Sequence, residues 1–372
     1  MKIHCSKEEL AQGVQTIQSA LSARTTLPIL LNFLMETENS KVKVVSTDLE
    51  MGVKHYMSAE VESDGSITIP AKKFSDILHS LPDGHEVELS VDPGGKVQLK
   101  CGRSRFGIVG APKSEYPILP EFNKQNAFEA PAGLIGEMVR KTIFAASSDE
   151  TRHVLNGVFW SAKKGILEMV STDGRRLSVI AKKAVPKEKD FQVIVPTKIL
   201  SELLRLLSQA DVKAGATEPI LVGVTENQIA FQYKETTLLS RLVGGSFPHY
   251  EQVIPNKKDI IVVLDTKDLL AVTKRASLCA VDRGGSVKYA LKKGVLQVSA
   301  SSQNLEFNDE LPVDYAGDDF QVAFNPAFVV DALRHVDTDK VSIGLTTPVN
   351  PALVEPVGGD GDYRFVVMPM RI

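Results

Sequence analysis

Cysteine is scarce in this sequence, and the spacing of the few cysteines excludes two kinds of site. Cys5, Cys101 and Cys279 lie far apart, and none belongs to a C-x-x-C pair. A disulfide framework needs more cysteines, and a zinc site needs closer ones. We therefore expect three reduced thiols packed among apolar side chains.

Long apolar runs are absent as well. No run approaches the roughly 18 residues that a membrane helix needs, and the opening MKIHCSKEEL lacks the apolar core of a signal peptide. Charged residues make up 24% of the chain and apolar residues 43%, as in ordinary soluble proteins. We expect a cytoplasmic protein with no membrane partner. The net charge of −3 argues against a protein that coats nucleic acid over its whole surface, but not against a locally basic face.

The usual catalytic motifs are missing. The seven histidines form no H-x-x-x-H or H-E-x-x-H pair, so we expect no metal site. The glycine pairs near Gly94, Gly244, Gly284 and Gly358 lack the spacing of a phosphate-binding loop, so we expect no nucleotide cofactor. With no activated nucleophile and no paired carboxylates, a binding or scaffolding role is favoured over catalysis.

One stretch keeps an enzymatic alternative open. Asp173, Gly174, Arg175 and Arg176 place an acid beside two arginines that could bind phosphate. The matching stretch near Asp48 has no arginines, and a tight turn with an exposed aspartate is the simpler interpretation.

The feature that organises the chain is a stretch that occurs three times. IPAKKFSDIL (69–78) recurs as VPTKILSELL (195–204) and more faintly as FNPAFVVDAL (324–333). Pro70 and Pro196 are 126 residues apart (196 minus 70), and Asn325 follows after 129 more (325 minus 196), which is the size of a small domain. Each copy reads as a strand that enters a helix, with proline suited to the first helical turn.

Other motifs repeat at the same offset, so three similar domains are predicted. STDLEM near Thr47 recurs as STDGRRL near Thr172, 125 residues later (172 minus 47). Each unit runs helix, strands, helix, strands, which predicts an α+β fold of antiparallel sheets with two helices on one face. We place the three domains at 1–120, 127–253 and 254–372. A basic helix face is suggested by Lys72, Lys73, Arg140, Lys141, Lys198, Arg205, Lys274, Arg275 and Arg334.

The C-terminal stretch VVMPMRI, residues 366–372, is unusually apolar for a chain end. It is either a last strand packed in its own domain or part of an adaptable peptide-binding surface, for which the flexible side chains of Met368 and Met370 are suited.

Several of these motifs together closely resemble one known family. They are TLPIL at Thr26, TDLEM at Thr47, IPAKKF at Ile69, GRSRF at Gly102, LNG at Leu155, TDGRRL at Thr172, FPHY at Phe247 and the terminal VVMPMR. In this combination and order the chain resembles the bacterial sliding clamps, the β subunits of DNA polymerase III, from Met1 to Ile372.

The resemblance implies a DNA polymerase processivity factor without catalytic activity. In that family two three-domain chains join head to tail into a six-domain ring, with sheets outside and helices inside. The ring encircles duplex DNA without reading its sequence. The implied partners are DNA, a second copy of the chain, replicative polymerase subunits, the clamp loader, and repair and translesion polymerases. A monomeric peptide-binding scaffold that never encircles DNA is the alternative.

By position, the resemblance also implies site residues. The family's DNA contacts fall on Arg24, Lys72, Asp149, Arg152, His153 and Val154. Asp149, His153 and Val154 depart from the polar and aromatic residues expected there. The family's peptide groove falls on Leu155, Thr172, Gly174, Arg175, Arg176, Leu177, Pro248, Val253, Asn325, Phe328, Val349, Val366, Met368, Pro369, Met370 and Arg371. Gln252 stands where an arginine is common, so the preferred peptide is expected to differ.

Overall fold

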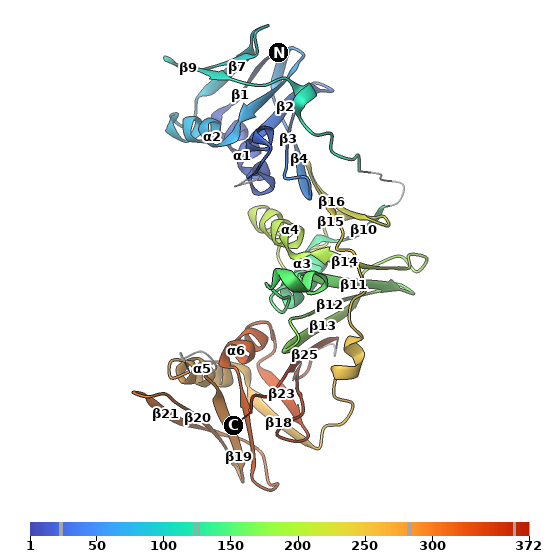
Figure 1. Ribbon diagram of the computed structural model, residues 1–372, viewed down its shortest axis with the longest axis vertical. Coiled ribbons are helices and arrows are strands. Elements are labelled where there is room, and N and C mark those ends of the chain that lie inside the picture. The colour runs from blue at the N-terminus through green and yellow to red at the C-terminus, as the bar shows by residue number, and fades with distance from the viewer. Residues whose placement is uncertain (22–24, 123, 125–126, 281–284, 360–361, 372) are drawn as a thin grey trace. The chain divides into compact units, whose positions relative to one another are not determined.

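The computed structural model describes residues 1–21, 25–122, 124, 127–280, 285–359 and 362–371. These residues form 25 strands and six α-helices, which confirms the predicted α+β class and its excess of strands (Figure 1). The strands pair in antiparallel fashion in four sheets, again as predicted. The chain divides into two compact units: unit 1 comprises Met1–Leu134 with Lys198–Leu242, and unit 2 comprises Ile135–Thr197 with Val243–Ile372.

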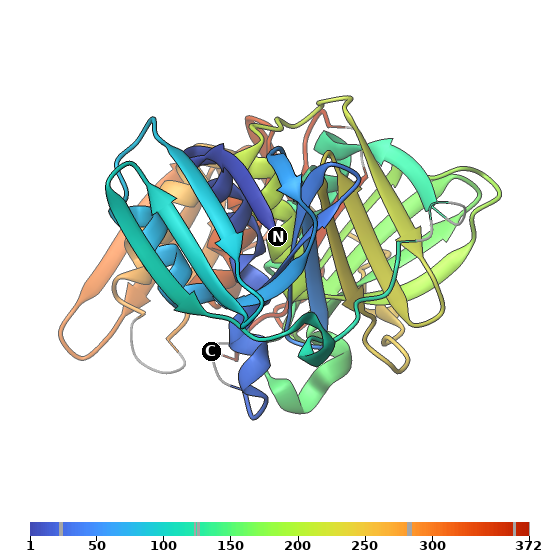
Figure 2. The same ribbon diagram turned by 90° about the horizontal axis from the view of Figure 1, so that it is seen from above.

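Unit 1 holds two sheets. The first, drawn in blue to teal in Figure 2, has the order β5 (Glu60–Ser63), β1 (Lys2–Ser6), β7 (Glu86–Val91), β8 (Lys96–Cys101) and β9 (Ser104–Val109). The second has the order β10 (Ala127–Pro131), β15 (Pro219–Val224), β16 (Gln228–Tyr233), β17 (Thr236–Arg241), β4 (Met51–Met57), β3 (Lys41–Thr47), β2 (Asn32–Glu38) and β6 (Ser66–Pro70).

Unit 2 also holds two sheets. The third sheet has the order β14 (Phe191–Pro196), β11 (Gly157–Lys163), β12 (Ile166–Thr172), β13 (Arg176–Lys183), β25 (Tyr363–Val367), β24 (Ala352–Pro356), β23 (Lys340–Leu345) and β18 (Ile260–Asp265). The fourth has the order β21 (Glu306–Pro312), β20 (Val295–Ser301), β19 (Val287–Lys292) and β22 (Phe320–Phe324).

Each repeat contributes two helices, as the repeat predicted. They are α1 (Lys7–Ile17), α2 (Ala71–Ser80), α3 (Ala132–Ile143), α4 (Thr197–Gln209), α5 (Thr266–Ser277) and α6 (Pro326–Arg334). The spacing of apolar residues in α1 predicts one buried face, and Leu10, Val14 and Ile17 are indeed buried. Ser6 caps this helix by accepting a hydrogen bond from the backbone N–H of Glu9, which satisfies one unpaired donor of the first turn.

The prediction that proline occupies the first helical turn is wrong for both Pro70 and Pro196, because each is the last residue of a strand, β6 or β14, and the helix begins at the next residue. Pro70 ends β6, where it lies opposite Asn32, and it precedes α2 with an extended ψ of 109°. In the third repeat Pro326 is the first helical residue, and Asn325 caps the helix by accepting from the N–H of Ala327 at 2.9 Å. The strand pairing therefore extends one residue further than the sequence suggested.

The two long sheets each join strands of different repeats. In the second sheet β17 pairs with β4, so that Leu239 lies opposite Gly52. In the third sheet β13 pairs with β25, so that Leu177 lies opposite Val366. The middle repeat thus contributes strands to both units, and its predicted bounds at 127–253 remain a prediction.

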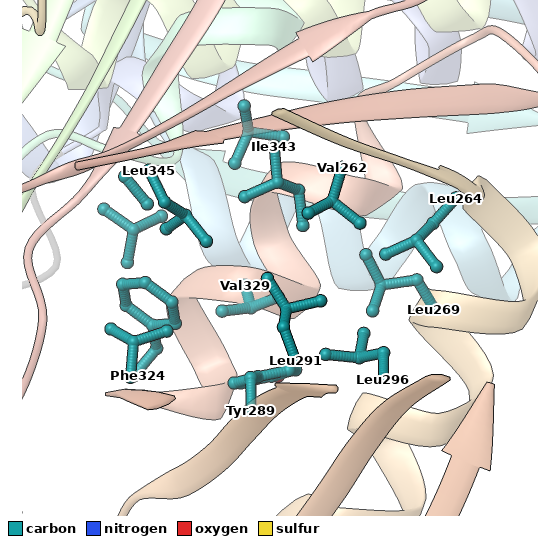
Figure 3. Close-up of a pocket in the computed structure, with 14 residues that line it drawn as sticks. Val262, Leu264, Leu269, Tyr289, Leu291, Leu296, Phe324, Val329, Ile343 and Leu345 are labelled. Atoms are coloured by element: carbon teal, nitrogen blue, oxygen red, sulfur yellow. The ribbon is translucent and has the colours of Figure 1, made fainter. Parts of the chain in front are cut away.

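Unit 2 contains an apolar region between its two sheets and the helices α5 and α6 (Figure 3). A cavity of about 40 Å³ lies there, lined by side chains such as Leu269, Tyr289, Val329 and Ala352. Because apolar walls offer water no hydrogen-bond partners, a cavity of this kind stays dry. Val367 of β25 lines it, whereas the preceding Val366 packs in a different cluster, as alternation along a strand requires.

Candidate functional site

The stretch Thr172–Leu177 forms a tight turn between β12 and β13. The carboxylate of Asp173 accepts from the backbone N–H groups of Arg175 and Arg176 at 2.8 and 3.1 Å. Gly174 has φ of +85°, which glycine adopts without strain. The predicted turn is confirmed, but the predicted exposure of Asp173 is wrong, since its side chain is only 16% exposed. Because it accepts two backbone hydrogen bonds within the turn, the Asp173 carboxylate stabilises the turn conformation.

Arg176 connects this turn to α6. Its Nε donates to Asp173 at 3.0 Å, Nη1 donates to Asp331 at 2.6 Å, and Nη2 donates to the carbonyl of Phe144 at 2.6 Å. The guanidinium also lies 4.7 Å from the ring centre of Phe328, within cation–π range. Because Nε, Nη1 and Nη2 all donate hydrogen bonds, the Arg176 side chain is held in place. It positions the turn relative to α6.

The C-terminal tail lies against the same turn. After β25 ends, the N–H of Met368 donates to the carbonyl of Arg175 at 2.9 Å. Two residues later the N–H of Met370 donates to the carbonyl of Ala323 at 2.8 Å. These two bonds hold the tail between β13 and the segment that enters α6. The strand alternative for the tail is therefore correct up to Val367, and the peptide-binding surface from Met368 stays a prediction.

An apolar cluster underlies the turn and the tail. Its buried members are Val170, Leu177, Val179, Tyr250, Leu353 and Val366, and Phe159, Phe247 and Ile254 pack against them. Burial raises the pKa of Tyr250, and the hydrogen bond that its hydroxyl donates to Glu168 adds to the rise. The tyrosine thus stays neutral and fixes the segment of Pro248 and Val253 over the third sheet.

The predicted groove residues differ in exposure. Leu155, Leu177 and Val366 are buried, whereas Val253, Val349 and Met368 are 43%, 75% and 37% exposed. Exposed aliphatic side chains beside a buried apolar cluster are what a peptide-binding surface needs.

Of the sixteen predicted groove residues, the contacts described above join ten; the six outside them are Leu155, Pro248, Val253, Val349, Pro369 and Arg371. The contacts above join Thr172, Gly174, Arg175, Arg176, Leu177, Phe328, Val366, Met368 and Met370, with Asn325 at the start of α6. Among the residues described, no polar contact ties Val349 or Arg371 to the turn. Val349 lies in the loop between β23 and β24.

The residues predicted to meet DNA lie in both units. Arg24 is outside the described residues, and Lys72 is exposed on α2. Asp149 caps a 3₁₀ helix, Glu150–Leu155, that holds Arg152, His153 and Val154. Arg152 is 47% exposed, yet it already donates to Asp149 at 3.1 Å and to the carbonyl of Asp173 at 2.9 Å.

The predicted basic helix face is largely paired with acids. Five of its nine members have carboxylate partners, namely Lys141, Lys198, Arg205, Arg275 and Arg334. Lys72, Lys73 and Lys274 are exposed and, within the described part of the chain, have no ion-pair partner. These three lysines are the positions best able to meet phosphates.

Sequence reasoning missed some of the groups that build this site. Neither the bond from Arg176 to Asp331 nor the support of Tyr250 by Glu168 was expected. The carboxylates lie 155 and 82 positions from their partners, so only a contact map could have joined them. Within the described ranges we find no cluster of potential metal ligands, and no helix there is long and apolar enough to cross a membrane.

Comparison with known proteins identifies relatives along the whole chain. The DNA polymerase III beta subunit matches through its N-terminal domain at residues 1–120, its central domain at 130–249 and its C-terminal domain at 251–371. Proteins named Beta sliding clamp from Pseudomonas aeruginosa and Haemophilus influenzae are 32% and 31% identical, and each alignment covers 100% of both chains. The three matches follow the order of the three repeats.

Solved structures of sliding clamps also superpose on the whole chain. A DNA polymerase sliding clamp from Bacillus subtilis superposes with a TM-score of 0.94 at 27% identity, covering 100% of this chain and 99% of that one. The DNA polymerase III subunit beta from Pseudomonas aeruginosa superposes with a TM-score of 0.93 at 31% identity, covering 100% of both.

Proposed function

The chain belongs to the DNA polymerase III beta subunit family, as its motifs predicted, and from this premise we propose how it acts. It is a DNA polymerase processivity factor. The observation that carries this conclusion is that three consecutive domains of that family match the chain in order. We place its work in the cytoplasm, where a bacterial chromosome lies.

We propose that two chains join head to tail and close a ring around duplex DNA. A contact of this kind that closes after two copies gives a dimer with two equal interfaces. The net charge of −3 and the pairing of most helix cations mean that electrostatic attraction alone would hold DNA weakly. Retention would instead come from enclosure, and loose phosphate contacts would let the ring slide.

We propose that the surface formed by the Thr172–Leu177 turn, the tail from Met368 and the start of α6 binds short peptides of partner proteins. The partners are polymerase subunits, the clamp loader, and repair and translesion polymerases. Burying one leucine and one phenylalanine of a peptide contributes about 1.5 to 3 kcal/mol each. After the costs of ordering, this suits exchangeable partners of micromolar affinity.

We further propose that the chain is not an enzyme and that its loading onto DNA is driven by a separate clamp loader. The rival catalytic interpretation placed its acid at Asp173. That carboxylate already accepts from the N–H groups of Arg175 and Arg176 and from Nε of Arg176, which favours a structural role.

The deciding experiment is retention on DNA after loading by the clamp loader. The protein is loaded on circular DNA, washed at high salt, and the circle is then cut. We expect salt-resistant retention on the circle and release after cutting, because electrostatic binding fades with salt whether or not the DNA has ends. Loss at high salt from the intact circle, with loading demonstrated, would favour the monomeric scaffold.

A further inference from the structure

The turn of the candidate site is built a second time in unit 1, at Thr47–Gly52. The hydroxyl of Thr47 donates to the carbonyl of Met51 at 2.8 Å, as that of Thr172 does to the carbonyl of Arg176 at 2.6 Å. The side chain of Asp48 accepts from the next two turn N–H groups at 3.0 and 2.7 Å, as Asp173 does in unit 2. The two turns therefore share one hydrogen-bond pattern.

The strands beside the two turns correspond as well. The corresponding backbone bonds are Arg241 N–H to Glu50 carbonyl at 3.0 Å and Met368 N–H to Arg175 carbonyl at 2.9 Å. By the same register, Leu239 takes the place of Val366 and Gly52 the place of Leu177. The surface that we propose for peptides in unit 2 thus has a structural equivalent in unit 1.

The equivalent surface carries a pocket of about 240 Å³. It is lined by Leu49, Met51, Gly52, Leu239 and the segment 117–120, with further polar residues around it. Met51 and Leu239 are buried in its floor, whereas Leu49 is 44% and Ile118 is 96% exposed. Pockets for whole small-molecule ligands are usually larger than about 300 Å³, so this one suits a single side chain.

The floors of the two sites are completed differently. Leu177 provides the floor in unit 2, but its counterpart Gly52 has no side chain. Instead Leu119 covers Gly52, so closely that a Cβ on Gly52 would lie 2.6 Å from Cδ1 of Leu119. The chain's own segment thus supplies the missing leucine and leaves the pocket beside it free. The rim has charges of both signs, since Arg241 lies 3.7 Å from Glu50 and both are well exposed.

We propose that this pocket in unit 1 is a second, weaker site for the same class of ligand, a linear peptide that inserts one aliphatic side chain between Leu49, Met51 and Leu239. The inference rests on the proposed peptide binding in unit 2, because it extends that mode to the equivalent surface. With one apolar anchor in place of two, binding is roughly ten- to a hundred-fold weaker than in unit 2. The exposed Leu49 and Ile118 close over the inserted side chain.

Methionine methyl signals distinguish the two sites, because Met51 lines the unit 1 pocket and Met368 lies in the unit 2 surface. The full chain, labelled with ¹³C at the methionine methyl groups, is titrated with a short peptide of serine and glutamine residues that ends in Leu-Phe. We expect the Met368 signal to shift first and the Met51 signal to shift at higher peptide concentration, each saturating separately.

Two variants assign the shifts. Leu49→Asp puts a charge at the pocket mouth. Position 49 has a positive φ of 77°, which aspartate adopts more readily than leucine, so we expect the variant to fold. It is expected to abolish the Met51 shift and to leave the Met368 shift unchanged. Met368→Ala is expected to weaken binding in unit 2 while the Met51 signal still shifts.

Each contrary outcome has a distinct meaning. If Met368 shifts and saturates while Met51 stays still at a hundred-fold higher peptide concentration, the second site is disproved and the proposed function stands. A Met51 shift that survives Leu49→Asp also disproves it, because the shift would then be transmitted from elsewhere. If neither signal moves, both proposals fail.

Discussion

Arg176 and Asp331 form an ion pair, Nη1 to Oδ2 at 2.6 Å, that ties β13 to α6 beneath the candidate peptide surface. The Arg176 side chain is 12% exposed, and its Nε also pairs with Asp173 at 3.0 Å. Removing one partner of a largely buried pair leaves the other charge without compensation.

Replacing Arg176 with methionine should therefore destabilise unit 2 more than its apolar contacts suggest. We expect Arg176→Met to lower the free energy of unfolding by about 2 to 4 kcal/mol, measured by urea titration. Arg175→Ala is the matched control, because the side chain of Arg175 is exposed and only its backbone carbonyl holds the tail. It should change stability by less than about 0.5 kcal/mol. Equal losses in the two variants would show that the ion pair contributes little.

Met368 should matter for peptide binding rather than for assembly. Its side chain is 37% exposed, and its backbone N–H, not the side chain, makes the bond to Arg175. We expect Met368→Ala to weaken peptide binding by roughly 1 kcal/mol, about five-fold, through lost apolar contact. Fluorescence anisotropy measures the affinity, and analytical ultracentrifugation measures the dimer.

Val109→Ala in β9 is the control for Met368→Ala, because it removes an exposed aliphatic side chain in unit 1. It should leave peptide affinity unchanged. Loss of the dimer in Met368→Ala would mean that the tail serves assembly.

Local patterns in the sequence predicted the elements well but not their partners. The cap at Ser6, the apolar face of α1 and the turn at Asp173 follow from a few neighbouring residues, and the structure has all three. The pairing of β13 with β25 joins residues about 190 positions apart, for which no local signal exists. The same holds for Asp331, whose role depends on an arginine in another repeat. The family resemblance supplied the site residues, and their contacts came only from the fold.

Lys72 offers a test of loose phosphate contact, because it is exposed on α2. We expect Lys72→Glu to weaken binding to a short open duplex and to make the slope of log affinity against log salt about 0.9 less negative, the value for one phosphate contact. Lys293→Glu, in the exposed turn after β19, is the control and should leave the slope unchanged. Identical salt slopes for all three proteins would remove Lys72 from the DNA-facing positions.

His55 should make the junction of β4 and β17 sensitive to acid. Its Nδ1 lies 2.9 Å from the hydroxyl of Thr236, and burial lowers its pKa below the usual 6.5. The folded state therefore binds fewer protons than the unfolded state in mild acid. The stability that this group contributes is complete above pH 6.5 and is lost as the pH falls through the lowered pKa.

Hydrogen exchange of the β4 and β17 amides measures this effect. Exchange should accelerate below about pH 6.5, after correction for the intrinsic rate. His55→Gln should reduce the acceleration, whereas His249→Gln, at an exposed histidine, should not. An unchanged pH profile in His55→Gln would assign the effect to other groups.

The cavity between the two sheets of unit 2 should accept a larger side chain. Ala352 is 1% exposed and lines the cavity of about 40 Å³. Ala352→Val adds two methyl groups and suits a strand, so we expect a gain of about 1 kcal/mol in the free energy of unfolding. Val354→Ala, on the same strand, enlarges the cavity and should cost about 2 kcal/mol. Urea unfolding of both variants measures the two changes. A loss of stability in Ala352→Val would mean that the sheets are held too rigidly to admit the methyl groups, because overpacking then costs more than the filled space contributes.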